Sequence, residues 1–386
     1  MQNDFLLFHK PFISEEEVDE IVDTVRSGWL SMGPKTIKFE ELFANYIGCK
    51  KGVAVSSWTA AGHLTLEAYG LKPGDEVIVP TMTFPATAEI VCYFGARPVI
   101  VDVDPETLNI SLEAIEKAIT PKTKVIIPVH YGGQPCDMDE ILDLAKKYNL
   151  KVMEYAAHSL PATYKGKKVG NISEVTCFSF YATKTLSTGE GGMICTNNED
   201  IAERVKIMRL HGINRDAWKR YTEAGSWYYE VVAPGYKYNF TDLQASLGLP
   251  QLKKVDQMWE SRKSIAKKYT EHFKDNELIK LHGLKPDRES SWHLYPVRLE
   301  LEKLTINRAR FIDELRKNKV GAGVHFMPVH QHLYYNETFN LKDENFPVAS
   351  GVFPRLVSLP IYPGMTEHNV DYVIDVVNSL LQKYKK

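Results

Sequence analysis

An alternation of short apolar runs with helical patterns covers residues 53–197 and constrains the fold of this 386-residue chain more than any other feature. The mostly apolar runs are 53–55, 76–79, 98–101, 125–129, 152–153, 177–180 and 193–195. Between them, apolar residues at three- and four-residue spacing predict helices near 59–69, 85–94, 111–119 and 138–148. Strands and helices in alternation predict an α/β fold, in which helices cover both faces of a largely parallel sheet.

The pattern changes after residue 241. We expect a long helix from Asp242 to about Lys274, interrupted at Pro250. The elements predicted beyond it are a strand over 292–299, a helix over 307–317, a strand around 324–326 and a terminal helix from Thr366. These elements predict a large α/β domain over 1–250, a smaller C-terminal α+β domain over 251–386, and a ligand site in the cleft between them.

Composition excludes several classes of protein. With 47 basic and 49 acidic residues the net charge is -2, which disfavours nucleic acid as a partner. The five cysteines form no C-x-x-C pair, so we expect free thiols, no metal site and a reducing cytoplasm. The N-terminal residues Met1 to Phe8 lack a basic segment followed by a long apolar one, and no run reaches the ~18 apolar residues of a membrane span. We therefore expect a cytoplasmic protein that does not enter a membrane.

Lys184 is the first candidate catalytic residue. It follows the apolar run 177–180 and precedes the small-residue segment Gly189-Glu190-Gly191-Gly192, which places it at the carboxyl edge of the sheet. A lysine whose amine is made nucleophilic can bind a carbonyl compound as a Schiff base, which is how proteins hold pyridoxal phosphate. Taken alone, the same segment is more typical of a surface lysine in a glycine-rich loop.

Two further segments end at the same edge. Ser56-Ser57-Trp58-Thr59-Ala60 joins the run 53–55 to a helix, so it presents a helix N-terminus and a threonine hydroxyl that suit a phosphate group. Glu154-Tyr155-Ala156-Ala157-His158 follows the run 152–153 and adds polar side chains. A simple N-cap and a strand end with satisfied side chains are the structural alternatives.

Motifs along nearly the whole chain resemble the DegT/StrS nucleotide-sugar aminotransferases, which are pyridoxal-phosphate enzymes of fold type I. The motifs, in chain order, are Ser27-Gly28-Trp29, Ser56-Ser57-x-Thr59-Ala60, Pro73-Gly74-Asp75-Glu76, Val101-Asp102-Val103-Asp104, His130-Tyr131-Gly132-Gly133, Glu154-x-Ala156-Ala157-His158, Phe178-Ser179-Phe180 with Lys184, Gly189-Glu190-Gly191-Gly192, Pro234-Gly235-Tyr236-Lys237-Tyr238-Asn239, Val324-His325-Phe326 and Ser358-Leu359-Pro360. The resemblance implies a mostly parallel seven-stranded sheet between helices and a smaller C-terminal α+β domain.

The resemblance also assigns roles around the cofactor. Lys184 is expected to bind the cofactor aldehyde and to move a proton between the substrate carbon and C4′ of the cofactor. Thr59, Ala60 and Ser179 are expected to hold the phosphate. Asn239 is expected to reach that phosphate from the partner subunit of a homodimer, although it also suits a turn before a helix cap at Thr241.

The remaining site residues lie nearer the ring and the substrate. Phe84 is expected to stack on the pyridine ring of the cofactor, or is a core aromatic residue. His158 is expected to approach the phenolic oxygen of the cofactor. His325 resembles a substrate-side histidine, although a histidine near a strand is more often structural.

Two residues depart from the family pattern. Tyr155 stands where the family has an aspartate that keeps the ring nitrogen protonated, so the pyridine ring becomes an electron sink. A phenol is neutral at pH 7 and can donate a hydrogen bond to an unprotonated nitrogen, but it cannot stabilise a pyridinium ion as a carboxylate does. Trp58 replaces a small residue and is expected either to crowd the phosphate or to pack outward.

Three functions follow from these observations. The first is transfer of an amino group, from glutamate, to a nucleotide-linked keto-deoxysugar in the synthesis of cell-surface polysaccharide or glycan precursors. Within the family, the segment 234–239 and the spacing of Ser56 to His63 resemble those of enzymes that act on UDP-linked 4-keto sugars, which favours a UDP-linked substrate. The second is a catalytically impaired homologue with a binding or regulatory role, which Tyr155 and Trp58 keep open. A sugar 3-dehydratase is the third, but that branch has a histidine at the position of Lys184.

Overall fold

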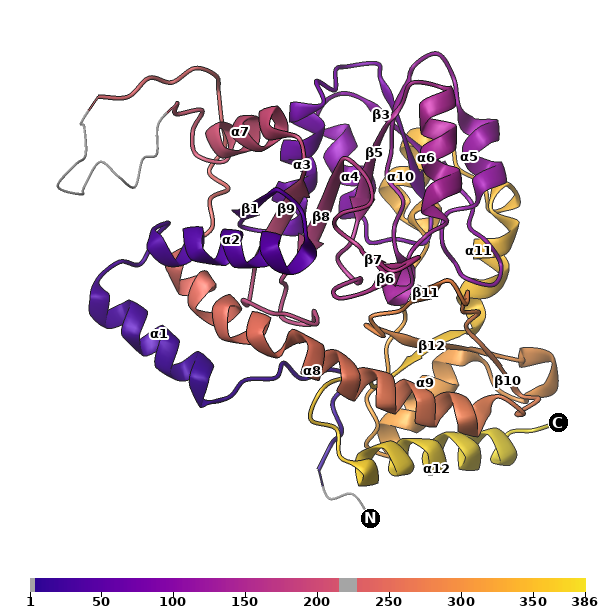
Figure 1. Cartoon of the computed structure of the whole chain (residues 1–386). Coiled ribbons are helices and arrows are strands. Elements are labelled where there is room, and N and C mark those ends of the chain that lie inside the picture. The colour runs from indigo at the N-terminus through magenta and orange to yellow at the C-terminus, as the bar shows by residue number, and fades with distance from the viewer. Residues whose placement is uncertain (1–3, 215–227) are drawn as a thin grey trace.

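A seven-stranded sheet forms the centre of the protein, as seen in a computed structural model that describes residues 4–214 and 228–386 (Figure 1). The first three residues of the N-terminal segment considered above lie outside this description. The strands are β1 Lys51–Val55, β2 Glu76–Pro80, β3 Arg97–Val101, β4 Thr123–Ile126, β5 Lys151–Tyr155, β8 Val175–Ser179 and β9 Gly192–Thr196. Their order is β1-β9-β8-β5-β4-β2-β3, and β9 is antiparallel to the other six strands, which share one direction. The predicted α/β fold and the seven predicted strands are confirmed.

Helices cover both faces of this sheet because successive strand residues point to opposite sides. Val77 and Val79 pack into one apolar cluster, whereas Ile78 packs into another on the opposite face. The covering helices are α3 Trp58–Ala68, α4 Ala86–Cys92, α5 Leu112–Ala118, α6 Met138–Lys147 and α7 Glu199–Met208. The predicted helices therefore form, and each ends within about two residues of its expected bounds.

The expected interruption at Pro250 is wrong. A single helix, α8 Asp242–Phe273, runs through this residue for 32 residues beside α1 Glu15–Ser27 and α2 Pro34–Ile47. Close packing on α2 keeps α8 helical through Pro250. A Cβ on Gly248 of α8 would lie 2.8 Å from the ring of Phe39 in α2. One missing hydrogen bond at the proline is thus outweighed by packing along the rest of the helix.

The C-terminal part is built on a second, three-stranded antiparallel sheet. Its order is β10 Ile279–Leu281, β12 Tyr295–Leu299, β13 Leu356–Leu359. The helices of this part are α9 Arg308–Lys317, α10 Leu333–Phe339, α11 Pro347–Val352 and α12 Glu367–Lys383. Short 3-10 turns of this part lie at Leu301–Lys303, Val329–Gln331, Asp343–Asn345 and Phe353–Arg355, and a further one, Tyr131–Gly133, lies between β4 and α6. The strands and helices again have the α+β arrangement that the sequence predicts.

The strand expected around 324–326 does not form. Backbone pairing there is limited to a bridge between Gly323 and Ser358 of β13, and His325 and Phe326 turn into a cavity instead. The division at residue 250 stays a prediction. In α8, Val255 and Met258 pack with residues of the large sheet, whereas Ile265 and Tyr269 pack with the C-terminal part.

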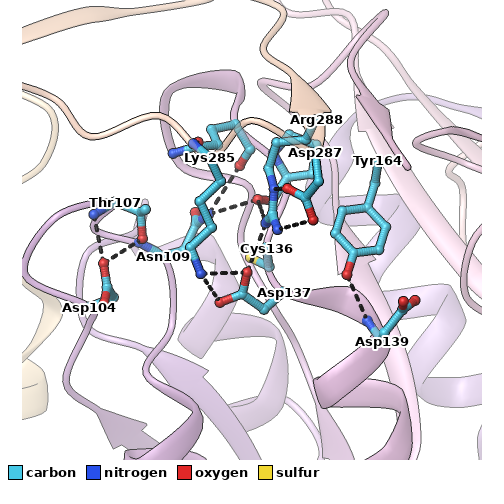
Figure 2. A network of polar contacts seen from close by, with 12 residues as sticks. Asp104, Thr107, Asn109, Cys136, Asp137, Asp139, Tyr164, Lys285, Asp287 and Arg288 are labelled. Atoms are coloured by element: carbon cyan, nitrogen blue, oxygen red, sulfur yellow. Dashed lines mark hydrogen bonds and ion pairs between the residues drawn. The ribbon is translucent and has the colours of Figure 1, made fainter. Parts of the chain in front are cut away.

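A polar network fastens the segment before β12 to the large sheet (Figure 2). Lys285 and Arg288 both pair with Asp137, at 2.6 and 2.9 Å, and the Arg288 guanidinium also donates to the carbonyl of Pro135. Arg288 and Glu289 form β11, which pairs with β6 Thr163–Tyr164 and, through it, with β7 Lys167–Lys168. These contacts fix the start of the chain segment that delivers His293 to the cavity.

The chain approaches the sheet closely just after this network. The backbone N–H groups of Ser291 and Leu294 donate to the carbonyls of Gly133 and Gly132. Gly133 has φ +109°, and a Cβ there would lie 2.1 Å from Ser291 Oγ and 3.2 Å from the amide nitrogen of His293. The glycine pair of the His-Tyr-Gly-Gly motif therefore makes room for the neighbouring chain.

No helix of the described residues has the length and apolar composition needed to span a membrane.

Candidate active site

A cavity of about 530 Å³ lies at the carboxyl ends of β5 and β8, beside the start of α3. This volume is within the usual range for small-molecule sites. Seven of the residues predicted from the sequence line it, namely Thr59, Phe84, Tyr155, His158, Ser179, Lys184 and His325.

Lys184 lies five residues beyond the end of β8, in a turn where its backbone N–H donates to the Tyr181 carbonyl. The side chain is partly buried, and its Nζ makes no hydrogen bond or ion pair with any residue that the structure describes. Desolvation by the surrounding protein lowers the pKa of this amine from 10.5 to about 7. A substantial fraction of Lys184 is therefore unprotonated, and nucleophilic, at neutral pH.

The N-terminus of α3 opens into the same cavity. Ser57 caps the helix by accepting a hydrogen bond from the Ala60 N–H at 3.0 Å. The N–H groups of Trp58 and Thr59 have no acceptor within the helix because they begin it. Gly192 of β9 allows this approach, since a Cβ there would lie 2.5 Å from the Ser57 carbonyl oxygen. Together with the Thr59 and Ser179 hydroxyls, these groups suit an anion such as phosphate.

A buried carboxylate holds the end of β5 in place. Glu154 is fully buried and accepts hydrogen bonds from His130, Ser173 and Thr176. Because His130 Nδ1 accepts from the Cys136 N–H, its Nε2 carries the proton and donates to Glu154 at 3.0 Å. These hydrogen bonds outweigh burial and keep the pKa of Glu154 below its usual value. The glutamate of the Glu-x-Ala-Ala-His motif thus supports the strand that presents residue 155.

Tyr155 and Trp58 form a pair of rings in the cavity wall. Their centroids are 3.8 Å apart, and both side chains are almost completely buried. The Trp58 indole N–H donates to the Cys177 carbonyl at 3.0 Å, so the ring points inward between α3 and β8. The expectation that Trp58 packs outward is therefore wrong. Burial raises the pKa of Tyr155 above its ordinary value, which keeps the phenol protonated.

Four histidines surround the cavity. His158 stacks on His293 at 4.4 Å, and His325 Nδ1 lies 3.0 Å from the Ser358 hydroxyl. Burial lowers the pKa of all four, to about 3 for His9 and about 4 for His325, and well below the usual value for His158 and His293. The rings are neutral at pH 7. His9 Nε2, His158 Nδ1 and His293 Nδ1 have no partner among the described residues, so they are available to polar groups of a ligand.

Two predicted site residues, Ala60 and Asn239, do not line the cavity, and a third, Phe84, lines it but is largely exposed. Ala60 is not part of the cavity wall, and its N–H is occupied by the Ser57 cap. Phe84 lies at the cavity with 54% of its surface exposed. Asn239 does not line the cavity; its amide donates to the Phe240 carbonyl, while its backbone bridges to Val55 at the end of β1. The roles assigned to these residues stay predictions.

His9, His293 and Glu190 also line the cavity, and the sequence alone does not predict them as site residues. Glu190 stands in the glycine-rich motif that drew attention to Lys184, so the signal for it was present. His293 follows Trp292 at the predicted strand start, but its position depends on contacts with Gly132 and Gly133 far away in the chain. His9 has no local signal.

A nucleophilic lysine beside a helix N-terminus, at the edge of a mostly parallel seven-stranded sheet, defines the class as fold type I pyridoxal-phosphate enzymes. The DegT/DnrJ/EryC1/StrS aminotransferase family matches residues 11–378, and this chain belongs to it. Its members and structural neighbours include pyridoxal-phosphate-dependent sugar aminotransferases.

Relatives match the chain over almost its whole length. The uncharacterized protein MJ1066 of Methanocaldococcus jannaschii is 53% identical over 380 residues, covering 98% of both chains. The spore coat polysaccharide biosynthesis protein SpsC of Bacillus subtilis is 46% identical over 382 residues, covering 99% of this chain and 98% of SpsC. The putative sugar aminotransferase Spr1654 of Streptococcus pneumoniae, solved in its PMP form, superimposes with a TM-score of 0.91 at 36% identity and covers 98% of this chain and 99% of its own.

The cavity has groups that suit both the aldehyde and the phosphate of pyridoxal phosphate. The Lys184 amine suits the aldehyde, and the α3 N-terminus with Thr59 and Ser179 suits the phosphate. A structure of Spr1654 in its PLP form agrees with this cofactor. Pyridoxal phosphate is therefore the cofactor, and the group presented at position 155 is a neutral phenol in place of a carboxylate. No cluster of three or more metal-ligating side chains is found within residues 4–214 and 228–386.

Proposed function

We propose that the protein transfers an amino group from glutamate to a nucleotide-linked keto-deoxysugar, with UDP-linked sugars favoured. The observation that carries the proposal is the unpaired Lys184 amine, with its pKa lowered to about 7, in a cavity that also receives a helix N-terminus. The relative SpsC is a spore coat polysaccharide biosynthesis protein, which supports a role in making polysaccharide or glycan precursors. We propose that it works in the cytoplasm as a homodimer in which Asn239 of each chain reaches the partner's phosphate site.

The cofactor, when bound, supplies an aldehyde that accepts the amino group and a ring that delocalises negative charge. Lys184 Nζ would be the base that moves a proton between the substrate carbon and C4′ of the cofactor, which a pKa of about 7 allows at neutral pH. His158 and His325, both neutral, orient polar groups of the ligands by hydrogen bonding. The stacked pair of His158 and His293 with Phe326 excludes water from one wall of the cavity.

Tyr155 limits the rate of this chemistry. A neutral phenol leaves the ring nitrogen mostly unprotonated, so the charge that develops when Lys184 removes a proton is less well delocalised. A deficit of ~3 kcal/mol in the transition state lowers the rate about a hundredfold. We therefore expect weak transamination, and a gain of at least about tenfold with Tyr155→Asp, together with tighter cofactor binding.

Steady-state rates of the two forms with one keto sugar decide this point. A robust rate with Tyr155 that falls in the aspartate variant contradicts the proposed limit and makes the tyrosine a residue adapted to the reaction. Tyr155→Phe is the matched control, because it keeps the ring and removes only the hydroxyl. It is expected to be no faster than wild type.

The substrate class is tested with a panel of nucleotide-linked keto sugars. The protein is incubated with glutamate and each sugar, and amino-sugar products are identified by mass spectrometry. Formation of a UDP-linked amino sugar supports the proposal; amination only of sugars on other nucleotides contradicts the UDP preference, and no amination with glutamate as the donor contradicts the proposed reaction. Lys184→Ala is the control and is expected to abolish turnover.

A catalytically impaired homologue with a binding or regulatory role is the second candidate, favoured by the paired rings of Trp58 and Tyr155. Cofactor uptake without amino transfer to any sugar of the panel, even in Tyr155→Asp, favours this candidate. Lys184 argues against the sugar 3-dehydratase, since that branch is expected to have a histidine there.

A further inference from the structure

Trp58, Gly62 and Tyr155 form one packed unit beneath the active site. Trp58 is the first residue of α3, and Gly62 follows it by four residues, so both lie on the same face of the helix. A Cβ on Gly62 would lie 3.2 Å from the Trp58 ring and 2.6 Å from the end of Ile90. Glycine inside a helix is unfavourable relative to alanine, so α3 gives up stability at the position where the indole and Ile90 both need space. The two residues are matched to one another.

The indole has a fixed orientation. Its N–H donates to the Cys177 carbonyl of β8 at 3.0 Å, and this hydrogen bond is buried. The ring lies against Tyr155, with centroids 3.8 Å apart and an interplanar angle of 33°. The backbone of Tyr155 is fixed to the segment after β4, because its N–H donates to the Pro128 carbonyl and its own carbonyl accepts from the His130 N–H. Trp58 therefore limits the directions in which the Tyr155 ring can point.

The hydroxyl of Tyr155 is a hydrogen-bond donor with no acceptor among the described residues, on a side chain that lines the cavity. Of the groups on the cofactor, the phosphate suits the α3 N-terminus and the aldehyde suits Lys184. His158 is expected to take the phenolic oxygen. The ring nitrogen is then the polar atom of the cofactor that remains for the Tyr155 hydroxyl. An unprotonated pyridine nitrogen can accept a hydrogen bond from this neutral donor.

We propose that Trp58 is a positioning residue that holds the Tyr155 hydroxyl toward the ring nitrogen of the cofactor, so that the site selects the unprotonated pyridine. This inference rests on the proposed function, because it requires the cofactor to bind in this cavity. Trp58 acts through Tyr155 and is not itself a catalytic residue.

The test compares pyridoxal phosphate with its 1-deaza analogue, in which a carbon atom replaces the ring nitrogen. Dissociation constants for the apo-protein are measured by calorimetry, and the ratio of the analogue constant to the cofactor constant reports on the nitrogen alone. A neutral hydrogen bond corresponds to a ratio about two- to tenfold larger in wild type than in a protein without it. We expect Trp58→Ala and Tyr155→Phe each to lower the ratio by this factor, and the double variant to lower it no further. Trp58→Phe, which keeps an aromatic ring, is expected to give a ratio of dissociation constants between those of wild type and Trp58→Ala.

If Trp58→Ala loses affinity equally for both ligands and the ratio is unchanged, Trp58 has a merely structural role. This result would overturn the inference but not the proposed function. Absence of binding of either ligand to wild type overturns the proposed function as well. Packing is checked separately by thermal unfolding of the apo-protein. Gly62→Ala is expected to lower the melting temperature more in wild type than in the Trp58→Ala background, where only the Ile90 contact remains; an equal change in both backgrounds contradicts the matched pair.

Discussion

The lowered pKa of Lys184 predicts an unusual pH dependence for its reactivity. With a pKa of about 7, about half of the amine is unprotonated at pH 7, whereas a lysine with the ordinary value of 10.5 is unprotonated in about 3 of 10,000 molecules. The nucleophilic form of Lys184 is therefore about a thousandfold more abundant than that of a free lysine at this pH. Above about pH 8 nearly all of Lys184 is unprotonated, so its reactivity reaches a plateau.

The assay is trace labelling of the apo-protein with acetic anhydride at a series of pH values. Mass spectrometry of the peptide that contains Lys184 gives its labelling rate, and Nα-acetyl-lysine in the same tube serves as the control. We expect the Lys184 rate to rise with a midpoint near pH 7 and then to level off, while the control continues to rise toward pH 10. A Lys184 rate that increases tenfold per pH unit through pH 9 would refute the reasoning, because burial would then not favour the neutral amine.

Three further predictions concern stability and assembly. Because Lys184 binds a proton in the unfolded but not the folded chain between pH 7 and 10.5, the unfolding free energy of the apo-protein relative to Lys184→Met should rise with pH, by at most about 5 kcal/mol, in denaturant titrations; a flat difference contradicts this. Gly133→Ala should lower stability by about 1 to 3 kcal/mol because of its positive φ and the contact with Ser291, whereas Gly166→Ala, with positive φ but open space, should cost less; equal losses in thermal melts contradict the role of the contact. Asn239→Ala should weaken cofactor retention about ten- to a hundredfold, and mixing it with Lys184→Ala subunits should restore activity, because one site of each mixed dimer is then intact; no recovery after verified exchange counts against a shared site.

The sequence predicts the large sheet well because its signals are local. Each strand is an apolar run bounded by turn residues, and side-chain oxygens such as those of Ser57 and Ser111 cap the helices that follow. The positions of Lys184 and Tyr155 at strand ends follow from the same pattern, since parallel strands end at one edge of the sheet.

Long-range packing decides what the sequence does not predict. Pro250 alone indicates a break, but the contact of Gly248 with Phe39 keeps α8 intact. The segment Val324-His325-Phe326 suggests a strand, yet His325 and Phe326 line the cavity instead.

The direction of Trp58 depends on space that Gly62 leaves one turn later in the helix. The sequence shows both residues but not their contact. The contact of Trp58 with Tyr155 joins a helix to a strand end about 100 residues later, so no local pattern reveals it.

Helix α8 has a mechanical consequence for the way the cavity opens. At 1.5 Å per residue its 32 residues make a rod of about 48 Å, and its two halves are embedded in different apolar clusters. Arg262 on this rod donates to the carbonyls of Trp292, His293 and Ile361, so the rod also carries one wall of the cavity. Turning the C-terminal part as a rigid flap would require the rod to bend. Ligand exchange is therefore expected to use side-chain and loop movement at the rim, with the exposed Phe84 ring as one such movable group.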